Sequence, residues 1–87
     1  MTTQCNIFKD GKLLFGNLRV DVRVTEDQKT MMKQWNGILY LSQREALVFF
    51  TNPASIYDIE LSDGRKGTFF AQPSGGPVLI IGQGPLV

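Results

Sequence analysis

The sequence predicts a small, mainly β protein: a partly closed antiparallel barrel or sandwich of about six short strands with one or two short helices. Three observations predict this class. The chain has 87 residues, which fits a single domain spanning 1–87 with a modest core. Residues 18–25 alternate strictly between apolar and polar side chains, as a half-buried strand does. Further short apolar runs are separated by glycine- and proline-containing turns, a pattern typical of small β folds.

The first turn is expected at Asp10-Gly11, which lies between two short β-prone runs within residues 8–15. Both residue types tolerate the positive φ angles of a tight hairpin. A two-residue turn would place Lys9 opposite Lys12, whereas a three-residue turn would place Phe8 opposite Lys12. Both registers are consistent with the residues.

A helix is predicted after the alternating strand. Thr25 and Gln28 occupy the reciprocal positions of a capping box, and the acidic residues between them suit the positive end of a helix dipole. Asn36-Gly37 then offers a C-terminal stop, so we expect two helical turns from about Glu26 to Gln34. An irregular loop is the alternative, because so short a helix depends on packing.

Residues 37–42 have the composition of a strand. Alternation places Leu39 and Leu41 on one of its faces and Ile38 and Tyr40 on the other.

The apolar run 46–50 fits either a short helix or a buried strand. Ser42 and Glu45 form a possible capping box in front of it, and Asn52-Pro53 ends it. We therefore expect residues 43–50 to form a helix.

A second hairpin is predicted over residues 56–70, and its register can be inferred. A two-residue turn at Asp63-Gly64 would direct Lys66 toward the core. A three-residue loop with a left-handed Gly64 instead pairs opposite charges on the outer face of the hairpin and apolar residues on its inner face. The expected pairs are Leu61 with Arg65, Glu60 with Lys66, Ile59 with Gly67, and Tyr57 with Phe69.

Apolar residues on both faces of several strands are the main functional signal. The predicted strand 78–81 is apolar on both faces, and Phe70 points outward if Phe69 points inward. Ile38 and Tyr40 likewise lie opposite the core side of their strand. These outward residues predict a face used for self-association or for a protein partner, unless the short helices cover them.

Catalysis is not expected, because the chain has no histidine and a single cysteine, Cys5. These counts exclude Ser-His-Asp and Cys-His arrangements and the common zinc sites, so we predict no enzyme activity, metal or cofactor. Cys5 is expected to be a small core residue. Asp58 and Glu60 share a strand face, but that face is expected to be exposed, with Glu60 near Lys66. Gly82-x-Gly84 lacks the helix that a dinucleotide site requires.

A single-stranded nucleic-acid binder is the alternative function. Small barrels use aromatic residues for stacking and basic residues for phosphates. The two predicted hairpins supply basic residues for this role: Lys9, Lys12, Arg65 and Lys66. The formal net charge of only +1 disfavours it.

The expected location is the cytoplasm, because the lone Cys5 has no disulfide partner within the chain and no leader-like segment opens the sequence. The apolar runs are too short for a membrane-spanning helix. We therefore expect a non-enzymatic binding or assembly module that forms a homo-oligomer or docks a protein partner.

Overall fold

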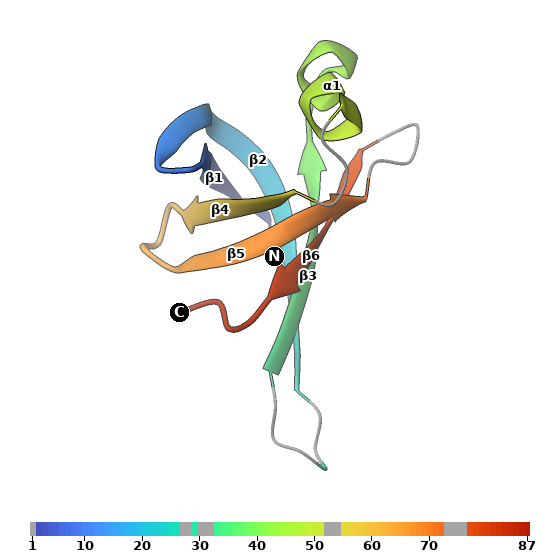
Figure 1. The fold of residues 1–87 in the computed structure, drawn as a ribbon. Coiled ribbons are helices and arrows are strands. Elements are labelled where there is room, and N and C mark those ends of the chain that lie inside the picture. The colour runs from blue at the N-terminus through green and yellow to red at the C-terminus, as the bar shows by residue number, and fades with distance from the viewer. Residues whose placement is uncertain (1, 27–28, 30–32, 52–54, 73–76) are drawn as a thin grey trace.

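The computed structural model describes residues 2–26, 29, 33–51, 55–72 and 77–87. Six antiparallel strands form a closed barrel in the order β1-β2-β3-β6-β5-β4, with β4 pairing back onto β1 (Figure 1). The elements are β1 (Thr2–Lys9), β2 (Lys12–Glu26), β3 (Lys33–Tyr40), α1 (Gln43–Thr51), β4 (Ile56–Leu61), β5 (Lys66–Gln72) and β6 (Val78–Gln83). The predicted mainly β class is confirmed, and the barrel is closed rather than partly closed.

The barrel consists of two three-stranded meanders, β1-β2-β3 and β4-β5-β6, joined by α1. The meanders meet along β1–β4 and along β3–β6. Both of these pairings join residues that are far apart in the sequence, so no local signal predicts them.

Inward positions of the strands form the core, as the alternation predicts. Leu18, Val20 and Val22 of β2 are buried, whereas Val24 is exposed because it lies beyond the barrel. The buried apolar side chains are Cys5, Ile7, Leu18, Val20, Val22, Trp35, Leu39, Ala46, Phe49, Tyr57, Ile59, Leu61, Phe69, Val78 and Ile80.

The helix α1 lies at one end of the barrel (Figure 1). It buries Ala46 and Phe49, and the Phe49 ring lies 5.0 Å from the Tyr57 ring and 6.0 Å from the Phe15 ring. The predicted capping box starts it: the Glu45 N–H donates to Ser42 Oγ, and the Ser42 N–H donates to Glu45 Oε1. The helix expected over 43–50 is confirmed, and it covers the end of the barrel rather than its outer face.

Both hairpins have the geometry of tight turns. The first is a two-residue turn with Lys9 opposite Lys12, and both Asp10 and Gly11 have positive φ, 52° and 80°. Lys9 Nζ donates to the carbonyl of Ile56 (3.1 Å), which draws it away from Lys12.

The second hairpin confirms the predicted register. Glu60 pairs with Lys66, Ile59 with Gly67 and Tyr57 with Phe69, the Leu61 N–H donates to the Arg65 carbonyl, and Gly64 has φ 95°.

The helix predicted from Glu26 to Gln34 is wrong at both of its ends. Glu26 ends β2, and Lys33 and Gln34 begin β3. Thr25 pairs with Gln34 and Glu26 with Lys33 in a continuous ladder, so strand pairing prevails over the local capping signal. The middle of this prediction, residues 27–28 and 30–32, lies outside the described residues.

This ladder extends past the rest of the barrel. The β3–β6 pairing ends at Asn36 and Ile81, and the β1–β2 pairing ends at Thr2 and Asp21. The paired ends of β2 and β3 therefore project as an arm, the β2–β3 arm (Figure 1), and the molecule measures 40 × 25 × 24 Å.

Candidate protein-binding face

An apolar strip crosses the outside of four neighbouring strands. One row of the sheet places Phe70 of β5 between Ile56 of β4 and Ile81 of β6. The next row places Leu79 of β6 beside Ile38 of β3. We call these five residues the outer band: Ile56, Phe70, Ile81, Leu79 and Ile38.

The outer band is accessible to solvent. The exposed fraction is 47% for Ile56 and 40% for Leu79, and the other three members are half-buried. Their sequence neighbours Tyr57, Phe69 and Ile80 are buried in the core. The sheet is thus apolar on both faces here, which is unusual unless another molecule covers the outer one.

Two of the three predicted interface residues lie within this band. Phe70 and Ile38 point outward as expected, and β6 separates them. Tyr40 is exposed at the end of β3, and the Arg19 guanidinium stacks 5.1 Å from its ring centre.

Three members of the band were not among the predicted interface residues: Ile56, Leu79 and Ile81. Apolar residues on both faces of strand 78–81 were the signal for Leu79 and Ile81. Only the strand order places these two residues between Phe70 and Ile38. Ile56 is the first residue of the hairpin predicted over 56–70, and it joins the band through its pairing with Phe70.

A hollow of about 340 Å³ lies at the β2–β3–β6 end of the band, and we call it the outer hollow. Its walls combine the apolar Ile38, Leu79 and Ile81 with polar and charged side chains of β2 and β3. The residues that line it are Asp21, Arg23, Asn36, Gly37, Ile38, Leu79, Ile80 and Ile81.

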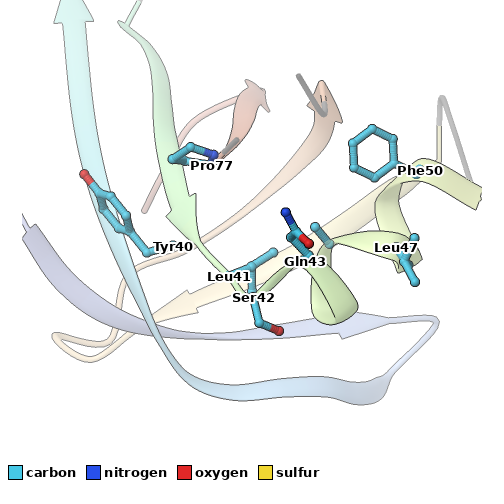
Figure 2. Close-up of a pocket in the computed structure, with 8 residues that line it drawn as sticks. Tyr40, Leu41, Ser42, Gln43, Leu47, Phe50 and Pro77 are labelled. Carbon is cyan, nitrogen blue, oxygen red and sulfur yellow. The ribbon is translucent and has the colours of Figure 1, made fainter. Parts of the chain in front are cut away.

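A second hollow of about 700 Å³ lies between α1 and the end of β3 (Figure 2). Leu47 and Phe50 of α1 are exposed on one side of it, and Tyr40 lies on the other. It extends the apolar surface past Tyr40 toward α1.

The four basic residues of the nucleic-acid alternative are not brought together. β1 and β4 run antiparallel, with Cys5 opposite Leu61 and Phe8 opposite Asp58. Lys9 and Lys12 therefore lie at one end of this ladder, and Arg65 and Lys66 lie at the other.

Most of these cations are also engaged in contacts within the chain. Lys9 Nζ lies 5.3 Å from the centre of the Tyr57 ring, Arg65 is bound to Asp63 (2.9 Å), and Lys66 lies 3.7 Å from Glu60. This arrangement forms no continuous basic groove among the four residues.

Burial and hydrogen bonding shift the pKa values of Cys5 and Asp63 in opposite directions. Cys5 is buried, and burial raises the pKa of its thiol to about 12, so the thiolate is not available near neutral pH. Asp63 is exposed, and hydrogen bonds from the Arg65 backbone and side chain lower its pKa. No group of three potential metal-ligating side chains occurs within residues 2–26, 29, 33–51, 55–72 and 77–87.

Asp58 is exposed on the outer face of β4, and Glu60 is half-buried there beside Lys66, as expected for that strand face. Across the part of the chain that the structure describes, no helix has the length and apolar character needed to cross a membrane.

The fold and this face define a small closed β-barrel with an accessible apolar surface. Comparison of the chain with protein families, characterised proteins and solved structures found no match.

Proposed function

We propose that this protein is a non-enzymatic assembly module that associates with itself through the outer band. The observation that carries the proposal is the continuity of the band: Phe70 and Ile81 are cross-strand neighbours, and so are Leu79 and Ile38. Apolar side chains that adjoin on one surface can be buried together in a single contact, and the gain grows with the apolar area buried.

The closed barrel favours contact through a face rather than through a strand edge. Every strand of the barrel pairs with two neighbours, so its body offers little opportunity for strand addition. A second molecule must therefore pack against side chains, and the outer band is the surface that gains from burial.

Electrostatic repulsion would oppose association only weakly. The formal net charge is +1, so two copies repel each other weakly at neutral pH. Closed two-fold dimers are the commonest assembly of a single chain, and we expect that state here.

Molar mass measured by light scattering after size exclusion tests the proposal. The wild type should have a mass above that of the 9.7 kDa chain, and Leu79→Ser or Phe70→Ser should reduce it toward the monomer. Leu13→Ser is the matched control, because Leu13 is 58% exposed on β2 outside the band and should leave the mass unchanged.

Circular dichroism of each variant separates loss of association from loss of folding. Leu79→Ser is the safer variant, since Leu79 is more exposed than Phe70. A folded Leu79→Ser protein with wild-type mass would contradict the proposal.

A further inference from the structure

We infer that the outer hollow is the contact between two copies of this chain, related by a two-fold axis that sets Asp21 of each copy against Arg23 of the other. This inference rests on the proposed self-association and specifies its geometry. It is carried by the way in which the sheet arranges the residues that line the hollow.

The lining residues fall into two parallel rows that cross three strands. The strand registers place Asp21, Ile38 and Leu79 in the first row. The same registers place Arg23, Asn36 and Ile81 in the second row. The buried positions between the rows are Val22, Gly37 and Ile80, and the last two form the floor of the hollow.

The two rows are complementary to each other. Each has a charged residue on β2 and an aliphatic residue on β6, and the two charges are opposite in sign. Outward residues two apart on a strand lie about 6–7 Å from each other, so both rows fit within one contact.

A two-fold axis can lie in the plane of the contact, midway between the two rows and parallel to them. It places the first row of one copy on the second row of the other. Asp21 then meets Arg23 of the other copy, and Leu79 meets Ile81 of the other copy. A symmetric interface repeats each contact, so both the ion pair and the aliphatic pair occur twice. Charge complementarity therefore favours a second copy as the occupant.

Gly37 lets β2 and β3 lie close together beneath the hollow. A β-carbon on Gly37 would lie 2.6 Å from the Asp21 carbonyl oxygen, so only glycine allows β2 and β3 to approach this closely. The hollow of about 340 Å³ can admit side chains from the rows of the other copy.

Charge reversal tests this geometry. Asp21→Arg alone and Arg23→Asp alone should each weaken dimerisation at least about tenfold at low salt, because like charges then face each other twice. The double variant Asp21→Arg/Arg23→Asp should restore it. An equimolar mixture of the two single variants should form mixed dimers in preference to dimers of either one.

Matched controls change the net charge equally outside the hollow. Glu26→Arg on the β2–β3 arm is the control for Asp21→Arg, and Lys12→Asp at the start of β2 is the control for Arg23→Asp. Neither Glu26 nor Lys12 lines the hollow, so these controls should have a much smaller effect.

Cross-linking provides a second measurement that needs no charged substitution. In a Cys5→Ala background, a mixture of Leu79→Cys and Ile81→Cys copies should form interchain disulfides faster than either variant alone. Equal rates in all three samples would contradict the arrangement.

The outcomes separate this inference from the proposed function. Dissociation by Leu79→Ser without any response to charge reversal would leave self-association standing and overturn the two-fold geometry. A wild type that remains monomeric would overturn both.

Discussion

The indole of Trp35 lies so close to the backbone of Gly82 that a β-carbon at position 82 would overlap the ring. Gly67 is also close to the ring, since a β-carbon there would lie 3.2 Å from Trp35 Cζ2. The Phe69 ring meets the indole edge-on, with centroids 6.4 Å apart. Gly82 therefore has a structural role, because it leaves space in the core for the Trp35 side chain.

Gly82→Ala is expected to reduce the free energy of unfolding by about 2 kcal/mol or more, because the new methyl group displaces the indole from its packed position. Gly16→Ala is the control, since a β-carbon at position 16 makes only ordinary contacts of 3.6 Å and longer. Urea titration followed by tryptophan fluorescence measures both. Equal losses for the two variants would show that the Trp35 contact does not constrain position 82.

Gly64→Val should destabilise the protein by about 1 kcal/mol or more, because valine is strained at the positive φ of Gly64, 95°. Gly64→Asn should cost less, since asparagine tolerates this region better. No atom lies within 4 Å of a β-carbon built at position 64, so the difference isolates backbone strain. Equally harmless valine and asparagine variants in denaturant titrations would contradict the loop geometry.

Ser42→Ala should cost about 1 kcal/mol, because the Glu45 N–H loses the hydroxyl that accepts its hydrogen bond at the start of α1. Ser42→Asp should retain much of the stability, since a carboxylate can accept the same bond. Thermal unfolding by circular dichroism ranks the three proteins. An alanine variant as stable as the wild type would mean that tertiary packing alone fixes the start of the helix.

Cys5 should make stability depend on pH in alkaline solution. Burial raises the folded-state pKa from 9.0 to about 12, so the folded protein keeps the thiol proton at pH values where the unfolded chain loses it. The stabilising effect is complete below pH 9 and is lost progressively as the pH rises toward 12.

The free energy of unfolding of wild type minus that of Cys5→Ala should therefore fall between pH 8 and pH 10.5, a range chosen to bracket the ordinary thiol pKa. The thiol should also react with a chromogenic disulfide only after denaturation. A constant difference across this range would indicate that the thiol is accessible to solvent.

The local parts of the fold could be predicted from the sequence. Charge pairing between Glu60 and Lys66 selected the three-residue loop, and Ser42 and Glu45 marked the start of α1. The prediction of a helix from Glu26 was wrong. The capping signals there are also local, but they compete with a long ladder between β2 and β3, and that ladder depends on the whole barrel.

The candidate site was only partly predictable for a related reason. Alternation determined that Phe70 and Ile38 point outward, since it depends only on neighbouring residues. Their connection through Leu79 and Ile81 depends on β6 lying between β5 and β3, which follows from the closed topology. The separation of Lys9 and Lys12 from Arg65 and Lys66 likewise follows from the antiparallel β1–β4 pairing.

Sedimentation velocity of the wild type over a wide concentration range measures self-association without any substitution. Self-association through the outer band predicts that the sedimentation coefficient rises with concentration from a monomer value to a dimer value. Leu79→Ser should remain at the monomer value throughout the same range. A wild-type protein that sediments as a single monomeric species at every concentration, up to millimolar, would show that the outer band does not mediate self-association.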